Sequence, residues 1–173
     1  MTARKARHSH EARFQISRLK SELDELYIRA DPRSIGDPEV AGDLARYLCI
    51  RVSGYLEQAT AIILRSYCTK NSWGDVQQFA MSWLDRTPNL SSDSLLRLVE
   101  RFNKAAAGEL TELLKIEERG SSINALIGIR NDIAHGRNQG LSRMQAWRYF
   151  EVVELVIEWL IGIFDPIVVE DPA

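Results

Sequence analysis

Apolar residues return every three or four positions along most of this chain, and this periodicity restricts the fold more than any other feature. Segments with such an apolar stripe run over residues 11–30, 38–69, 73–83, 91–102, 105–118, 121–135 and 142–165. No segment shows sustained alternation of apolar and polar residues, and the apolar run at 167–169 is too isolated to build a sheet. The sequence therefore predicts an all-α fold, an antiparallel up-and-down bundle of six to seven helices.

Proline, glycine and capping residues mark the ends of these helices. Asp37-Pro38-Glu39 supplies an N-cap, a proline at the first helical position and an early acid for the long second helix. We expect Gly120 to end the helix before it, and Ser121 or Ser122 to cap the helix that follows.

The length and hydrophobic content predict one domain. A chain of 173 residues, 45% of them hydrophobic, can bury a core but is too short for two independent domains. We expect a flexible basic tail at 1–10, a single helical domain at 11–165 and an acidic tail at 166–173. Cys49 and Cys68 fall on one predicted helix, about 28 Å apart, so we expect two buried free thiols in a reducing compartment rather than a disulfide.

Composition and motif searches remove several classes of protein. The net charge of −2 argues against a strongly basic nucleic-acid coat, so a nucleic-acid partner must be held by a local patch. No apolar run reaches the length of a membrane span, and the N-terminal segment lacks the apolar core of a signal peptide, which predicts a cytoplasmic protein with no membrane partner. No zinc-ligand spacing, phosphate-loop glycine pattern or GxSxG elbow occurs, so we expect no metal and no cofactor.

The segment from Arg130 to Gly136, with the sequence RNDIAHG, is the best candidate for chemistry. It places an arginine five residues before His135, which is the one histidine outside the N-terminal segment. An arginine is a fixed cation that grips a phosphate in a fork, and histidine has the unperturbed pKa closest to neutral pH. In RNA, a general base can start attack by the 2′-hydroxyl while a guanidinium stabilises charge on the phosphoryl oxygens. The pair therefore suits RNA cleavage.

Helical geometry sets a condition on this pair, because Arg130 and His135 lie about 140° apart on a straight helix. The helix can end near Ala134, so that His135 turns at the C-cap, or a two-fold dimer can bring both motifs to one groove. We expect both. Gly128 on the same small polar face would permit close approach, and the Asn131 amide, one turn before His135, could orient the imidazole.

At these residues the chain resembles the HEPN superfamily in its RiboL-PSP branch. The superfamily motif is an arginine, four to six residues and then a histidine, often with asparagine directly after the arginine, and Arg130-Asn131 and His135 match it. The likeness covers about residues 37–164. It includes a long early helix with Gly54-Tyr55-Leu56-Glu57, the segment 89–102 and a long, aromatic-rich last helix, whereas the first predicted helix has no clear place in the minimal family pattern.

The resemblance implies a bundle that forms a homodimer along the motif helices and cleaves RNA without a metal, often as a toxin or an antiviral defence effector. By position, it assigns Arg130 and His135 as catalytic residues and Asn131 and Glu57 as supporting residues. Glu57 is either a partly buried acid that holds Arg130 or an exposed one. Cleavage by this route is restricted to RNA and leaves a 2′,3′-cyclic phosphate.

Three arginines follow the motif and are candidates for contacts with the RNA backbone, namely Arg137, Arg143 and Arg148. They equally suit a solvated face. Four tryptophans lie at apolar-face positions and are interpreted as core residues rather than base-stacking surfaces, namely Trp73, Trp83, Trp147 and Trp159. For Trp147, burial in an interface is left open.

Alternatives to the nuclease remain. In the first alternative, the motif has only a structural role: Arg130 pairs with an acid and His135 caps its helix. In another, the chain is a non-catalytic HEPN-like module that binds RNA, a nucleotide or a protein partner. In a third, an antitoxin partner such as a nucleotidyltransferase holds the protein silent.

Overall fold

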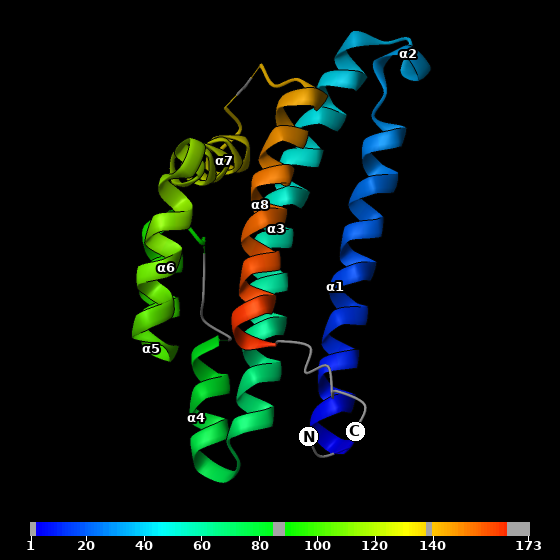
Figure 1. Ribbon diagram of the computed structural model, residues 1–173. Coiled ribbons are helices and arrows are strands. Elements are labelled where there is room, and N and C mark those ends of the chain that lie inside the picture. Colours follow the sequence, from blue (N-terminus) through cyan, green and yellow to red (C-terminus); the bar gives the residue numbers. More distant parts are fainter. Residues whose placement is uncertain (1–2, 85–88, 138–139, 166–173) are drawn as a thin grey trace, which may run out of the picture.

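The computed structural model describes residues 3–84, 89–137 and 140–165, and over these residues it contains helices and no strand (Figure 1). The elements are α1 (Ala3–Arg29), α2 (Pro32–Ile35), α3 (Pro38–Asn71), α4 (Gly74–Leu84), α5 (Ser92–Phe102), α6 (Lys104–Lys115), the 3-10 helix η1 (Ile116–Glu118), α7 (Arg119–Ala134) and α8 (Arg143–Phe164). The prediction of an all-α fold is confirmed for these residues. None of their helices is long and apolar enough to cross a membrane.

The longest helix, α3, lies between α1 and α8 and forms the centre of the bundle (Figure 1). Its Leu48, Leu56 and Leu64 have no exposed surface. The helix runs antiparallel to α1, as expected for an up-and-down order. By contrast, α8 runs parallel to α3, because the chain returns through α4 to α7 before α8 begins. Helix α7 lies beside the start of α8, and α4 lies at the opposite end of the bundle (Figure 1).

The predicted start of α3 is confirmed. The Asp37 side chain accepts hydrogen bonds from the backbone N–H groups of Glu39 and Val40, at 2.8 and 3.4 Å, and Pro38 occupies the first helical position. These contacts satisfy two of the N–H groups that a helix start leaves without an internal acceptor.

The first helix begins earlier than predicted. Helix α1 starts at Ala3 and covers most of the segment 1–10 that we expected to be a flexible tail. Its first turns are held by contacts with distant parts of the chain, since the Ser66 hydroxyl on α3 donates to the His8 carbonyl at 3.4 Å. Tertiary contact thus compensates for the missing apolar stripe. The expected acidic tail at 166–173 lies outside the described residues.

The junction before α7 also differs from prediction. We expected Gly120 to end a helix and Ser121 or Ser122 to cap the next, but Gly120 lies in the first turn of α7. The chain instead turns at Glu117 and Glu118, whose φ angles of 51° and 55° are left-handed. Gly120 lies beside Leu114, and a Cβ atom at this position would be in ordinary van der Waals contact, 3.5 Å from the Leu114 carbonyl oxygen.

The interpretation of all four tryptophans as core residues was wrong for two of them. Trp147 and Trp159 are partly buried, and the Trp147 ring lies 4.1 Å from the ring of Tyr27 on α1. Trp73 and Trp83 are exposed. Helix α4 packs beside α3 with a side other than its aromatic stripe, and the stripe is left uncovered by the described residues.

Both cysteines are buried and free, as predicted. Burial raises the pKa of the Cys49 thiol to about 12 and also raises the pKa of Cys68. A thiol that is protonated and shielded from solvent is a poor nucleophile. Both residues therefore act as small apolar side chains of the core.

A buried group of charges holds the end of α8 against α1 and α3. The Asp165 side chain is 2% exposed and forms ion pairs with Arg13, at 2.9 Å, and with Lys70. It also accepts a hydrogen bond of 2.6 Å from the Ser9 hydroxyl. A carboxylate removed from water in this way is stable only because cations and donors surround it.

Substitution Asp165→Asn should therefore lower the free energy of unfolding by about 3 kcal/mol, since it leaves the Lys70 ammonium buried without its counter-charge. Urea denaturation at neutral pH measures the change. The control is Glu112→Gln, which breaks an exposed ion pair with Lys115 and should change stability by less than about 1 kcal/mol. Equal effects of the two substitutions would contradict this account of α8.

Candidate functional site

The RNDIAHG motif occupies the last turns of α7 and the residues just beyond it. Leu126 is fully buried, and Ile129 and Ile133 are partly buried against the core, as predicted from their spacing. This apolar side fixes the rotation of α7 in the bundle. The opposite side presents Gly128 to solvent, with no atom within 4 Å of a Cβ atom built there.

The end of α7 is set by hydrogen bonds typical of a Schellman motif. His135 is the C-cap, Gly136 has a φ of 71° and donates its N–H to the Ile133 carbonyl at 3.0 Å, and the Arg137 N–H donates to the Asp132 carbonyl at 2.9 Å. Glycine suits this position because its left-handed conformation is strained for other residues. The prediction that α7 ends at Ala134 is confirmed, and the His135 side chain is exposed at the helix end.

Arg130 points to a different environment, toward α3. Its guanidinium donates a 3.2 Å hydrogen bond to the side-chain oxygen of Asn131 and interacts electrostatically with Glu57 of α3. Both Arg130 and Glu57 are partly buried. The structure therefore supports the first of the two alternatives for Glu57, a partly buried acid beside Arg130.

The Glu57 carboxyl group is placed where its charge is poorly solvated. Burial raises its pKa, and the Arg130 charge and a hydrogen bond from the Asn89 backbone N–H partly oppose this rise. Its Oε1 atom is buried and has no hydrogen-bond partner among the described residues. The carboxylate thus depends on Arg130 and Asn89 for its stabilisation.

The segment 89–92 links α3 to α7 and was not identified from the sequence as part of the site. Asn89 has a φ of 42°, a left-handed conformation that asparagine tolerates better than most residues. The Asn89 N–H donates a hydrogen bond to Glu57. The backbone N–H and the hydroxyl of Ser92 donate to the side-chain oxygen of Asn124 on α7, at 3.0 and 3.1 Å. An asparagine two residues before the capping Ser91 was the available signal, but it does not reveal the distant partners of this segment.

The structure does not join all the residues that the sequence placed in the motif. Within the described residues of one chain, the His135 side chain makes no hydrogen bond or ion pair, either with Arg130 or with Asn131. The Asn131 amide oxygen faces Arg130 and does not orient His135 as we expected. The two ends of the motif thus differ in restraint. The Arg130 guanidinium is hydrogen-bonded, whereas the His135 imidazole makes no such contact among the described residues.

The three arginines beyond the motif have different surroundings. Arg137 is exposed and forms an ion pair of 2.9 Å with Asp132. Arg143 forms an ion pair of 3.2 Å with Asp31 and stacks its guanidinium 4.0 Å from the centre of the Tyr27 ring. Arg148 is exposed on α8. Arg143 therefore fastens the start of α8 to the end of α1, whereas Arg137 and Arg148 remain at the surface.

The chemistry available at this site is anion binding by a guanidinium and proton transfer by an exposed imidazole. Among the described residues, no group of three or more His, Cys, Asp or Glu side chains is arranged to hold a metal ion.

Comparison with known protein families gives a match that covers most of the chain. The model of the RiboL-PSP-HEPN family matches residues 15–165, which include α3, α7 and every residue of the site described above. Comparisons with curated proteins and with solved structures gave no match.

The raised pKa of Glu57 predicts a pH dependence of stability. A carboxyl group with a raised pKa in the folded state binds its proton more tightly when folded, so its stabilising contribution is present below its unfolded pKa and is lost as pH rises through its folded pKa. Wild type should therefore lose stability relative to Glu57→Gln as pH rises from about 4 through the raised folded pKa of Glu57, as measured by urea denaturation. Glu112→Gln at an exposed position is the control, and a parallel pH dependence in wild type and Glu57→Gln would contradict the prediction.

Proposed function

Because the chain belongs to the RiboL-PSP-HEPN family, whose members are commonly ribonucleases, we propose that it is a metal-independent endoribonuclease. The observation that carries the proposal is the arrangement of the two ends of the motif. Arg130 is held by its neighbours as a fixed cation, and His135 stands exposed at the helix end, free to meet a substrate. These are the groups that cleavage of an RNA phosphodiester requires.

In the proposed reaction, His135 takes the proton of the 2′-hydroxyl, whose oxygen attacks the adjacent phosphorus. The bond from phosphorus to the 5′-oxygen breaks, and that oxygen leaves as a hydroxyl after it receives a proton from solvent water, while the protonated His135 returns its proton to solvent. Arg130 stabilises the negative charge that develops on the phosphoryl oxygens. The products are a 2′,3′-cyclic phosphate and a 5′-hydroxyl, and DNA is not a substrate because it lacks the 2′-hydroxyl.

The supporting residues act through Arg130. The Asn131 amide oxygen accepts a hydrogen bond from its guanidinium, and the Glu57 carboxylate of α3 attracts it electrostatically. Asn89 supports Glu57 in turn. Arg137 and Arg148 are at the surface and suit contacts with the RNA backbone, which add affinity with little sequence preference.

We further propose a homodimer that completes the site. Arg130 and His135 do not contact each other in one chain, whereas a two-fold pairing of α7 with its mate would place two such pairs along one groove. The exposed Gly128 has the open space that close approach of another helix needs. A role as a toxin or antiviral effector, and an antitoxin such as a nucleotidyltransferase, belong to the same proposal.

Cleavage of end-labelled RNA in excess EDTA tests the chemistry. His135→Ala and Arg130→Ala should each reduce the rate by a factor of about 10² to 10⁴, the usual contribution of a general base or an oxyanion-stabilising group. His10→Ala removes another exposed histidine, on α1, and should leave the rate unchanged. The new ends should be 2′,3′-cyclic phosphates.

If wild type and His135→Ala cleave equally, the activity does not arise at this motif. If neither cleaves any of a varied set of RNAs while both are folded, the non-catalytic alternative is favoured. In that case the contacts of Arg130 with Glu57 and Asn131 are structural.

Substitution Gly128→Leu tests the dimer. In one chain a Cβ atom at position 128 has no atom within 4 Å, and replacing a glycine within a helix removes a penalty of about 0.5–1 kcal/mol, so the fold should be kept or stabilised. Pairing of α7 should be blocked, with a lower mass by analytical ultracentrifugation and loss of cleavage.

Gly108→Leu is the matched control, since Gly108 is an exposed glycine of α6 whose Cβ position is equally open. It should change neither the mass nor the cleavage rate. Dimers and activity that survive Gly128→Leu would place the interface elsewhere.

A further inference from the structure

The α4 helix carries an exposed apolar face that takes no part in the site on α7. Val76, Phe79 and Trp83 follow one another at helical spacing and are 69%, 67% and 51% exposed, and Trp73 just before the helix is 82% exposed. A side chain of this size is seldom left so open in a monomer, and several in a row mark an interaction surface. The face lies at the end of the bundle opposite α7 (Figure 1).

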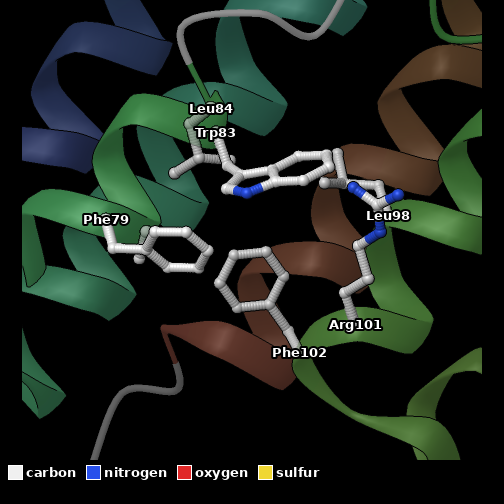
Figure 2. A pocket seen from close by; sticks show the side chains of 7 residues that line it. Phe79, Trp83, Leu84, Leu98, Arg101 and Phe102 are labelled. Carbon is white, nitrogen blue, oxygen red and sulfur yellow. The ribbon is translucent and has the colours of Figure 1, made fainter. Parts of the chain in front are cut away.

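Beside this face is a hollow of about 430 Å³ between α4 and α5. Figure 2 shows the rings of Phe79, Trp83 and Phe102 around it, with Arg101 at its edge. Arg101 is the one charged side chain in the lining, and its guanidinium lies 4.2 Å from the centre of the Trp83 ring. The hollow thus suits apolar side chains accompanied by one acid that reaches Arg101.

These features favour a protein helix over RNA as the occupant. Helix α4 contains no lysine or arginine and one acid, Asp75, so it lacks the cations that hold a phosphate backbone. The Arg101 guanidinium also covers one face of Trp83, where a base would stack. An amphipathic helix with an acidic residue is the complementary partner.

Helix α4 itself has this chemistry, and we propose that the occupant is a second copy of this chain. The helix runs from Gly74 to Leu84, so an antiparallel pair of α4 helices related by a two-fold axis is centred on Phe79. In this register Asp75 of the second copy lies opposite Trp83, beside Arg101. The same contact is repeated on the other side of the axis.

The pairing makes one surface complementary to itself. The aromatic side chains of both copies fill the space along the axis, and an acid and a guanidinium meet at each end. This pairing of α4 helices does not depend on the proposed nuclease activity. If α7 also pairs, each chain has two different two-fold interfaces at opposite ends of the bundle, and four or more chains assemble.

Charge reversal tests both the partner and the register. Asp75→Arg places two arginines opposite each other at both ends of the pair, and Arg101→Glu places two acids there. Each variant should self-associate on the order of tenfold more weakly than wild type. Its mass by analytical ultracentrifugation should therefore be lower than that of wild type at equal concentration, and the concentration at which half of the chains are paired should rise by the same factor. Both residues are exposed, so the fold should be kept.

The decisive sample is an equimolar mixture of the two variants. At one end of a mixed pair, the arginine introduced at position 75 faces the glutamate introduced at position 101 of the other chain. At the other end, the unaltered Asp75 faces the unaltered Arg101, so both ends attract again. The mixture should regain the wild-type mass, and native mass spectrometry should show mixed pairs. Rescue of this kind is not expected if a different protein occupies the face.

A cysteine at the axis provides a second measurement. Phe79→Cys should form an intermolecular disulfide on mild oxidation, since residue 79 lies next to its own mate, whereas Ile28→Cys, equally exposed on α1, should not. The native Cys49 and Cys68 are buried and do not compete. Unchanged masses of both charge variants, or no rescue in the mixture, would overturn the proposal and leave the face to a different protein.

Discussion

Burial of α3 between α1 and α8 is the constraint on which the rest of the structure depends. Leucines on this helix have no exposed surface, and removing such side chains from water supplies most of the stability of a helical bundle. Because α3 is central, its residues reach several elements at once. Arg51 pairs with Glu22 of α1 and Glu57 faces Arg130 of α7. Contacts with α3 therefore set the position of α7 and of the motif that it carries.

The candidate site is built in two parts with different degrees of restraint. Arg130 donates a hydrogen bond to Asn131 of its own helix and is attracted by Glu57 of α3, whose charge Asn89 helps to stabilise. His135 instead follows the last helical residue and is positioned by the backbone alone. A fixed guanidinium can be aligned in advance with a phosphate, whereas an imidazole that exchanges protons needs access to its substrate. The two ends of the motif thus differ as their proposed roles require.

The surfaces of the bundle divide its tasks. At one end, α7 presents a small polar face around Gly128, which suits a second copy of the same helix. At the other end, α4 presents aromatic side chains, and Arg101 limits what can cover them. Ion pairs of the buried Asp165 with Arg13 and Lys70 hold the end of α8 against α1 and α3. The bundle therefore separates the α7 face from the α4 face, the two surfaces that we propose pair with a second chain.

The sequence by itself determined the helical class, the cap at Asp37 and the end of α7 near Ala134. These features depend on local spacing and on conformations of single residues. The outward face of Trp73 and Trp83, the turn at Glu117 and the role of Asn89 were decided by tertiary structure. Each depends on which distant element occupies the adjacent space, and periodicity cannot say which of two apolar helix sides meets the core. Only the packed chain settles that, because burial belongs to the whole bundle and not to one helix.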